Sequence, residues 1–307
     1  MPRKNLQTEK IIKEAVASFP VFATHLWHYL RLPSPTPVQY QLADYLQHGP
    51  DRRIIMAYRG CGKACLTAGY VLWRLRRDPD TKVLVISAAQ DRADAFSVFC
   101  HDLLRNWFMV KDLFPSDTQR FSKVAFDVYG AKPDQSPSVR SSGIFGQITG
   151  SRADLIVADD TETPQSCETQ LIRDKLREAI KEFDSVIKPG GEIVFLGTPH
   201  TQDSIYAKLE LAGYTCRIWP ALYPTAKKRQ NYYGNRLAPK IASDLDDDKS
   251  LAGRPVDPKR FGWEELEARQ QSIGRSTFNL QFLLDISLRD EEKYPLKLKD
   301  LCVFRLN

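Results

Sequence analysis

A glycine turn between an apolar run and a helical pattern constrains the fold of this chain more than any other feature. The apolar run covers residues 54–57, the turn reads YRGCGK over residues 58–63, and a helical pattern follows over residues 64–75. Glycines allow a backbone to curl until successive N–H groups point at one centre. A helix that starts there adds the positive end of its dipole. The segment therefore predicts a strand, a loop suited to phosphate and a helix.

The turn resembles the phosphate-binding loop G-x-x-x-x-G-K-[ST], with two departures. Ala57 occupies the position of the first glycine, and Ala64 occupies that of the Ser or Thr that binds Mg²⁺. In such a loop Lys63 reaches the β- and γ-phosphates. The alternative is a glycine turn that caps a core helix, with Lys63 in solvent. The residues expected to surround the phosphates are Arg59, Gly60, Cys61, Gly62, Lys63, Ala64 and Cys65.

Composition and charge exclude some classes of protein. The 307 residues include 44 basic and 38 acidic side chains, which gives a net charge of +6. This charge permits a polyanionic partner but does not establish one. No apolar run approaches the roughly 18 residues that a membrane span needs, so we expect no membrane partner. The N-terminus lacks the apolar segment of a secretory signal, and the six cysteines have no ligand spacing.

The N-terminal region, residues 1–34, reads as a helical segment in two pieces with Pro20 between them. The stretch PTPVQYQLADYL follows from Pro35 and places Gln39 near the start of a helix. The amide of a glutamine can donate to and accept from the N6/N7 edge of adenine at once. Gln39 is therefore the candidate for reading the base, and its alternative is a solvated helix residue.

Strands and helices alternate along the centre of the chain. Apolar runs at residues 83–88, 155–158 and 192–200 are separated by helical patterns at residues 90–107 and 171–187. This alternation predicts a doubly wound α/β fold, with a mainly parallel sheet and helices on both faces. We assign residues 35–219 to a P-loop NTPase core of the RecA/ASCE-like type. Residues 220–307 read as a loop-rich linker or lid subdomain.

Carboxylates at the end of the strand over residues 155–158 supply the second half of a hydrolytic site. Asp159 directly follows this run and is expected to hold Mg²⁺. A second carboxylate must deprotonate the attacking water, and both Asp160 and Glu162 are candidates. Glu162 is slightly favoured because its side chain is longer. The alternative for the whole group is a solvated strand end.

Three further residues are candidates for contact with the phosphates. Arg59 lies in the turn, where a guanidinium can bridge β- and γ-phosphate oxygens. Thr198 follows the next strand and is a candidate sensor of the γ-phosphate. Arg152, just before the strand that carries Asp159, is a weaker candidate for a charge clamp within or between subunits.

A basic, tyrosine-rich stretch after residue 220 is a candidate surface for the DNA backbone. An acidic segment follows it, with Asp244, Asp246, Asp247 and Asp248, and reads as a solvated loop. A solvated loop is also the alternative for the basic stretch. Its candidate contacts are Lys227, Lys228, Arg229, Arg236 and Lys240.

Taken in order, five segments resemble the ATPase domain of the large terminase subunit of tailed bacteriophages, of the short-tailed T7-like type. These segments are PTPVQ, YRGCGKA, VLVISA, TGSRADLIVADDTE and VFLGTPH. The resemblance runs from about Ala17 to Leu284. It implies an ATP- and Mg²⁺-dependent motor that moves double-stranded DNA through a portal protein into a procapsid. It assigns base reading to Gln39, phosphate binding to Arg59 and Lys63, metal binding to Asp159 and coupling to Thr198.

The resemblance further implies a ring of copies on the portal, a monomer in isolation, a small terminase subunit as partner and the host cell cytoplasm as location. The family's C-terminal nuclease domain is expected to lie beyond this chain. One interpretation of Ala64 is an engineered replacement of Ser or Thr, which predicts ATP binding with very slow hydrolysis.

Two other functions stay open from the sequence. A helicase-type ATPase shares the PTPVQ motif, but its second lobe has no room after Pro199 and the metal segment reads ADDTE rather than DEAD. A non-hydrolysing, nucleotide-dependent assembly module is compatible with Ala64.

Overall fold

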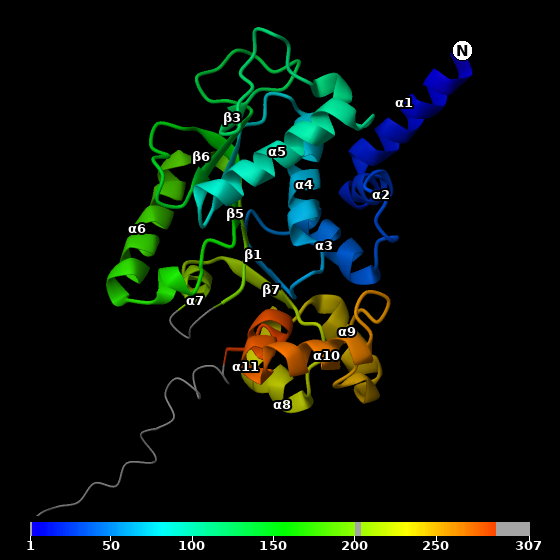
Figure 1. Ribbon diagram of the computed structural model, residues 1–307, viewed down its shortest axis with the longest axis vertical. Coiled ribbons are helices and arrows are strands. Elements are labelled where there is room, and N and C mark those ends of the chain that lie inside the picture. The colour runs from blue at the N-terminus through cyan, green and yellow to red at the C-terminus, as the bar shows by residue number, and fades with distance from the viewer. Residues whose placement is uncertain (1, 200–203, 287–307) are drawn as a thin grey trace, which may run out of the picture.

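One mixed sheet organises the computed structural model, which describes residues 2–199 and 204–286 (Figure 1). The described residues form seven strands in the order β3-β4-β2-β5-β6-β1-β7. All neighbouring pairs are parallel except β3 and β4. In chain order the strands are β1 (Arg52–Ala57), β2 (Val83–Ser87), β3 (Ala125–Phe126), β4 (Val139–Gly143), β5 (Ala153–Asp159), β6 (Ile187–Leu196) and β7 (Thr215–Trp219). The predicted mainly parallel α/β fold is confirmed.

The helical crossovers run in opposite directions along the sheet in the first and second halves of the chain, which makes the sheet doubly wound. Helices α4 (Lys63–Arg77) and α5 (Gln90–Asn106) connect strands toward the β4 edge, whereas α6 (Gln170–Val186) and α7 (Ile205–Leu211) connect strands toward β7 (Figure 1). Parallel crossovers are almost always right-handed, so opposite directions place the two pairs of helices on opposite faces. The central strands are buried on both faces and therefore consist of continuous apolar runs.

Strand β6 lies between β1 and β5, and the register brings their carboxyl ends together. Ile55 of β1 pairs with Leu196 of β6, and Leu196 pairs with Asp159 of β5. On the other side of β5, Asp159 pairs with Ser87 of β2. Loops that follow these strands consequently meet at one edge of the sheet, where ligands of such folds bind.

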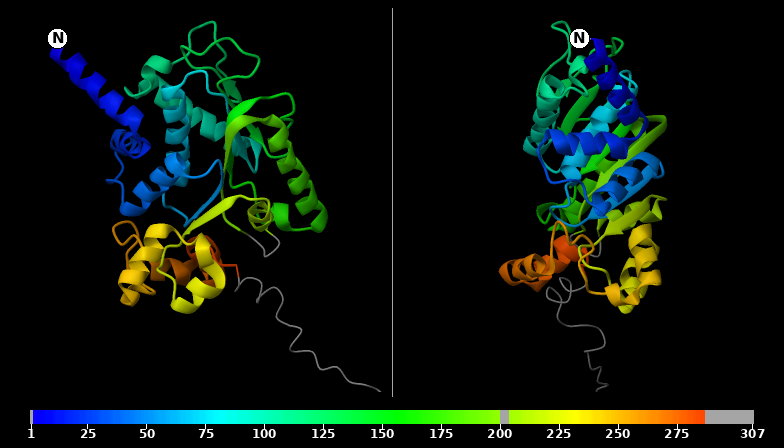
Figure 2. Two further views of the ribbon diagram at one scale, coloured as in Figure 1. Left: turned by 180° about the vertical axis from the view of Figure 1, so that it is seen from behind. Right: turned by 90° about the vertical axis from the view of Figure 1, so that its right-hand side faces the viewer.

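Three helices precede the sheet: α1 (Pro2–Ala17), α2 (Phe19–Tyr29) and α3 (Pro37–His48). The break between α1 and α2 falls at Ser18, and Pro20 lies in the first turn of α2 rather than between the helices. A proline is tolerated there because the first N–H groups of a helix have no intrahelical partner. Helix α1 projects from the body of the molecule (Figures 1 and 2).

The chain after β7 folds into short helices joined by loops. The acidic segment expected as a solvated loop lies largely in α9, whose Ile241 and Leu245 are buried. Apolar residues four apart give a helix one buried stripe. The elements are α8 (Ala226–Lys228), the π-helix η3 (Arg229–Tyr233), the 3₁₀ turns η4 (Gly234–Arg236) and η5 (Lys249–Leu251), α9 (Pro239–Asp247), α10 (Trp263–Ile273), α11 (Arg275–Phe278) and the π-helix η6 (Asn279–Leu283). The predicted domain boundaries stay a prediction.

Candidate nucleotide site

The glycine turn follows β1 directly and ends where α4 begins at Lys63, which confirms the predicted strand, turn and helix. Gly60 and Gly62 have φ angles of +88° and +95°, in the left-handed region that favours glycine. A Cβ on Gly62 would lie 3.1 Å from the ring of Trp27 and 3.2 Å from Nε2 of Gln39. The turn therefore requires glycine at both positions, for its backbone angle and for space.

Lys63 is half-buried, and its amine donates a hydrogen bond to the carbonyl of Ala57, the last residue of β1. Its charge also lowers the pKa of Asp159. The two residues come from segments about a hundred positions apart, and the sheet register brings them to one edge. Of the two alternatives for Lys63, a free solvated side chain does not fit these contacts.

Asp159 is the last residue of β5. Desolvation raises the pKa of its carboxyl, and the neighbouring Asp160 raises it further, while Lys63 and Arg92 lower it. The result is a pKa of about 6. Burial makes the charged form of this carboxyl costly, so a cation bound beside it would be electrostatically favourable.

Asp160 and Glu162 have different surroundings. Asp160 has a left-handed backbone with φ of +45°, and its N–H donates to the Leu196 carbonyl at 2.7 Å. Its side chain is 40% exposed and lies 3.8 Å from Arg92. Glu162 is buried, and its Oε2 accepts hydrogen bonds from the Ser204 hydroxyl at 2.8 Å and the Ile205 N–H at 2.7 Å. Asp160 is therefore the more accessible of the two carboxylates, and the choice of the water-activating group between Asp160 and Glu162 stays a prediction.

Gln39 is buried, and both ends of its amide have partners within the protein. Its Oε1 accepts from the Thr36 N–H at 2.9 Å, and its Nε2 donates to the Cys61 carbonyl at 2.9 Å. Gln39 is therefore tied to the loop and is not a solvated helix residue. The amide keeps one N–H and one lone pair beyond these bonds, so base reading stays a prediction.

The remaining predicted contacts are distributed around the loop. Arg59 is exposed, and its guanidinium donates to the Gln281 side chain at 3.1 Å. Ala64 is exposed at the start of α4, so a hydroxyl there would face outward from the helix surface. Burial raises the pKa of Cys65 to about 12, which keeps this thiol protonated. Thr198 is half-buried, two residues beyond the end of β6.

Arg152 lies at the wrong end of its strand for a clamp within this chain. It precedes β5, whereas the site lies at the other end of the strand, about 20 Å away at 3.3 Å per residue. Its guanidinium donates to the Ser185 carbonyl at 2.9 Å. Only a role between subunits stays open for it.

Two groups at the site were missed from the sequence. Arg92, in the first turn of α5, lies beside Asp160. Its position just after β2 is a signal that parallel-sheet reasoning could have used. The second group is the turn formed by residues 257–261, which contacts the glycine loop from outside. No spacing in the sequence indicates this contact, because about two hundred residues separate the two segments.

The carboxylates at this site suit a magnesium ion that is also bound by phosphates and waters. They are too few for a metal site made of protein ligands alone. Asp159 and Asp160 offer two carboxylates, and Mg²⁺ in nucleotide sites uses one or two carboxylates with phosphates and waters. Residues 2–199 and 204–286 contain no group of three or more His, Cys, Asp or Glu suited to a metal. Thr67 cannot replace the hydroxyl missing at Ala64, because it is buried and donates to the Lys63 carbonyl at 2.9 Å.

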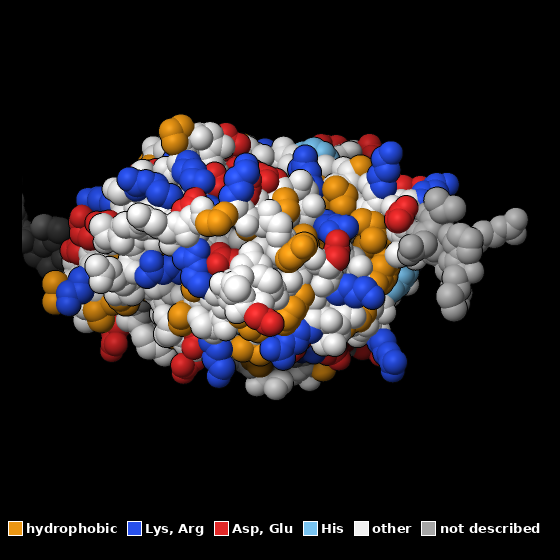
Figure 3. Space-filling view, turned by 90° about the horizontal axis from the view of Figure 1, so that it is seen from above, with side chains coloured by type: hydrophobic (Ala, Val, Ile, Leu, Met, Phe, Trp, Pro, Cys, Tyr) orange, Lys and Arg blue, Asp and Glu red, His pale blue; other side chains and the backbone are white. Residues whose placement is uncertain are grey.

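Four of the five predicted DNA-contacting side chains pair with acidic groups. Lys228 pairs with Asp285, and Arg229 forms two hydrogen bonds with Asp246 at 2.7 and 3.0 Å. Lys240 pairs with Asp244, and Arg236 lies 3.6 Å from Glu210. Figure 3 shows Lys and Arg mixed with acidic and apolar side chains on another face as well. The basic stretch is thus largely neutralised, and DNA contact there stays a prediction.

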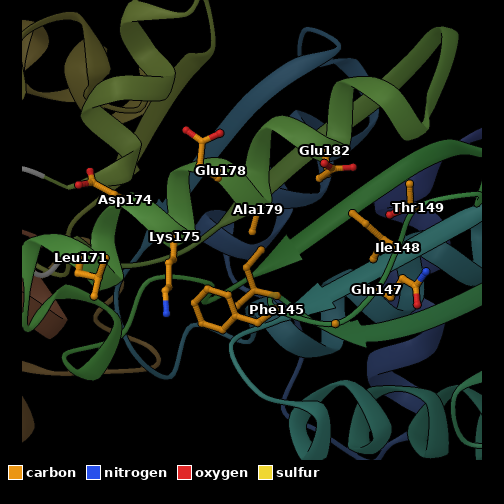
Figure 4. Close-up of a pocket in the computed structure, with 12 residues that line it drawn as sticks. Phe145, Gln147, Ile148, Thr149, Leu171, Asp174, Lys175, Glu178, Ala179 and Glu182 are labelled. Carbon is orange, nitrogen blue, oxygen red and sulfur yellow. The ribbon is translucent and has the colours of Figure 1, made fainter.

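A separate groove of about 530 Å³ opens between residues 144–149 and α6 (Figure 4). Phe145 and Leu171 line it and are 58% and 66% exposed. Acidic side chains of α6 line its other side. None of the predicted nucleotide or metal residues lines this groove, so it is a feature distinct from that site.

The fold and the site together define an α/β protein of the P-loop class, in which one strand separates the loop strand from the strand that carries the acidic residues. No helix within the described residues is long and apolar enough to cross a membrane. The sequence is 43% identical over 302 residues to the large terminase subunit of Enterobacteria phage T3. The alignment covers 97% of this chain and 52% of that protein.

The chain therefore belongs to the large terminase family and spans about half the length of this relative. No protein-family model matches it. Among solved structures it is similar to the large terminase ATPase domain of Thermus phage P74-26, with TM-score 0.44 and 12% identity over 80% of this chain and 92% of that one. It is also similar to the large terminase of bacteriophage HK97, with TM-score 0.45 and 15% identity over 80% and 50%.

Proposed function

We propose that this chain is the ATP-hydrolysing part of a motor that packages double-stranded viral DNA into a procapsid. Membership of the large terminase family supports the proposal. The single structural observation that carries it is that Lys63, directly after the glycine turn, and Asp159 lie at the same edge of the sheet, where the charge of Lys63 lowers the pKa of the Asp159 carboxyl. Nucleotide hydrolysis requires a lysine that binds phosphate and a carboxylate that binds the metal at one site.

In this proposal the residues of the chain have distinct tasks. Loop N–H groups and Lys63 would bind the β- and γ-phosphates. Arg59 would release the Gln281 side chain and donate its hydrogen bonds to phosphate oxygens instead. Asp159 would hold Mg²⁺, and Asp160 would accept the proton of the attacking water. Mg²⁺, when bound, supplies neutralisation of the phosphate charge. Thr198, at the end of the strand between them, contacts the γ-phosphate.

The proposed partners follow from the family relationship. They are double-stranded DNA, the portal protein and procapsid, the small terminase subunit and further copies of this chain in a ring on the portal. We propose that the isolated chain is a monomer and that it acts in the host cell cytoplasm. The family relationship favours this motor over a helicase.

A nucleotide assay tests the proposal. ATP binding is measured by calorimetry and hydrolysis by phosphate release, with DNA and portal-bearing procapsids present. We expect the chain to bind ATP, Lys63→Ala to abolish binding, and Lys181→Ala, an exposed lysine paired with Glu178, to have no effect. Absence of ATP binding would refute the proposal.

A second candidate function is a nucleotide-dependent assembly module that does not hydrolyse ATP. The exposed Ala64, which offers no hydroxyl to the metal, favours it. The two candidates separate on the Ala64→Ser variant. Turnover that appears in this variant and depends on DNA and procapsids supports the motor, whereas binding without turnover supports the assembly module.

A further inference from the structure

Asp257 connects two segments that are far from it in the sequence. Its Oδ2 accepts a hydrogen bond from the Thr36 hydroxyl at 2.6 Å and another from the Tyr58 hydroxyl at 2.9 Å. Asp257 is 4% exposed, Thr36 is 6% exposed and Tyr58 is fully buried. Hydrogen bonds to a carboxylate in a buried setting are about twice as strong as neutral ones, and losing one leaves a costly unpaired group.

The two donors belong to different halves of the nucleotide site. Thr36 precedes α3, and its N–H fixes the amide of Gln39, whose other end holds the Cys61 carbonyl. Tyr58 is the first residue of the glycine loop, and its N–H donates to the Trp219 carbonyl at 3.1 Å. One carboxylate oxygen therefore orders both the predicted base-reading side and the phosphate-binding side.

The turn that begins at Asp257 also contacts the loop directly. The N–H groups of Arg260 and Phe261 donate to the Asp257 carbonyl at 3.0 and 2.9 Å, which closes the turn. Arg260 then donates from Nε to the Gly60 carbonyl. A Cβ on Gly60 would lie 2.9 Å from the Phe261 ring, so the ring packs directly on the loop backbone.

We propose that Asp257 is a positioning residue that holds the base-reading and phosphate-binding halves of the nucleotide site in register. This inference rests on the proposed nucleotide function. Its physical basis is preorganisation: a loop already held in its binding conformation spends less free energy on ordering when phosphate arrives. Each hydroxyl bonded to Asp257 controls one half of the site, and the two effects can be measured separately.

The test uses two variants that each remove one hydroxyl and keep the side-chain shape. Thr36→Val removes the bond on the base side, and Tyr58→Phe removes the bond on the loop side. Calorimetry measures the binding of ATP, GTP and inorganic tripolyphosphate to the full chain and to each variant. The matched controls are Thr24→Val and Tyr40→Phe, whose hydroxyls bond each other at 3.2 Å on the exposed surface.

The expected pattern differs between the variants. Tyr58→Phe should weaken the binding of ATP and of tripolyphosphate by the same factor, about tenfold for the loss of one hydrogen bond to a charged group. Thr36→Val should weaken ATP about tenfold, change tripolyphosphate less than about twofold and reduce the preference for ATP over GTP. Asp257→Ala, which removes the acceptor of both hydrogen bonds, should show both effects, and the controls should show neither.

The test compares the affinities of the three ligands for one variant. Their ratio stays valid if the variant is partly unfolded, because every ligand binds the same folded fraction. The inference is overturned if both variants weaken ATP and tripolyphosphate equally, which indicates general structural support, or if neither variant changes binding. If the unaltered chain binds none of the three ligands, the proposed function fails and the inference falls with it.

Discussion

Glu162 accepts a hydrogen bond from the N–H of Ile205 at 2.7 Å and thereby caps the start of helix α7. The Ser204 hydroxyl donates to the same oxygen at 2.8 Å. A carboxylate at a helix N-terminus satisfies N–H groups that have no intrahelical partner and interacts favourably with the helix dipole. Glu162 therefore stabilises the start of α7 in this conformation.

Glu162→Ala should lower the stability of the protein. Its removal leaves a buried hydroxyl and a buried N–H without their acceptor, and each such loss costs about 1–3 kcal/mol. Thermal unfolding should show a clear fall in Tm for Glu162→Ala. The control is Glu178→Ala, at an exposed glutamate of α6, which should change the free energy of unfolding by no more than about 0.5 kcal/mol. Equal Tm values for the two variants would contradict the capping role.

Asp160→Asn should reduce ATP turnover while leaving stability nearly unchanged. The amide cannot accept the proton of the attacking water, and general-base catalysis contributes roughly 10²–10⁴-fold. The measurement is phosphate release in the Ala64→Ser background, so that turnover is detectable. Asp174→Asn, on the surface of α6, serves as the control. Turnover retained in Asp160→Asn would return the role to Glu162.

Ala64→Ser should raise ATP turnover about 10²–10³-fold with a modest effect on ATP affinity. The serine hydroxyl supplies a metal-binding oxygen that matters most as charge moves in the transition state, where one such contact is worth roughly 3–4 kcal/mol. Steady-state hydrolysis and calorimetric ATP titration of the two proteins give both quantities. Equal turnover in the unaltered chain and the Ala64→Ser variant would show that the metal is held without this hydroxyl.

The raised pKa of Asp159 makes stability depend on pH when no Mg²⁺ is present. A pKa raised from 3.8 to about 6 means that the folded state favours the protonated carboxyl. The stabilising contribution is complete below pH 3.8 and is lost as the pH rises through about 6. Asp159→Asn should therefore have a higher Tm than the unaltered chain at pH 7.5, because its free energy of unfolding is larger by on the order of 3 kcal/mol.

The same comparison at pH 5 and with Mg²⁺ and ATP supplies its control. The difference between Asp159→Asn and the unaltered chain should shrink at pH 5, where the carboxyl is largely protonated. It should reverse with Mg²⁺ and ATP, because bound ligand stabilises the folded state of the unaltered chain. A difference in Tm that is independent of pH would exclude this role for Asp159.

Asp246→Asn tests the basic stretch as a DNA surface. Arg229 forms two hydrogen bonds with Asp246, so neutralising the acid frees a cation for phosphate contact. If the stretch tracks DNA, the variant should bind double-stranded DNA more tightly and steepen the dependence of log K on log salt by about one contact. Asp117→Asn, far along the chain, is the control. Unchanged affinity and slope would remove this stretch from the candidates.

Local sequence patterns were sufficient to predict the elements that carry the site. Alternating apolar runs and helical patterns fixed a parallel α/β sheet, and the glycines before Lys63 fixed the turn, because these features depend on neighbouring residues. Asp159 at the end of an apolar strand was predictable for the same reason. The order of the strands is harder to predict from the sequence. It is not needed to place Lys63 and Asp159 together, because the carboxyl ends of all parallel strands lie at one edge of the sheet.

Which candidate side chains are already bonded within the protein became clear only from the tertiary structure. Glu162 and Gln39 have suitable chemistry in the sequence, but their bonds to Ile205 and Cys61 come from chain packing. The carboxylates of α9 neutralise cations of the basic stretch, and Asp257 reaches Thr36 and Tyr58 across about two hundred residues. Such contacts leave no periodicity or spacing in the sequence, because they depend on how distant segments pack and not on local conformation.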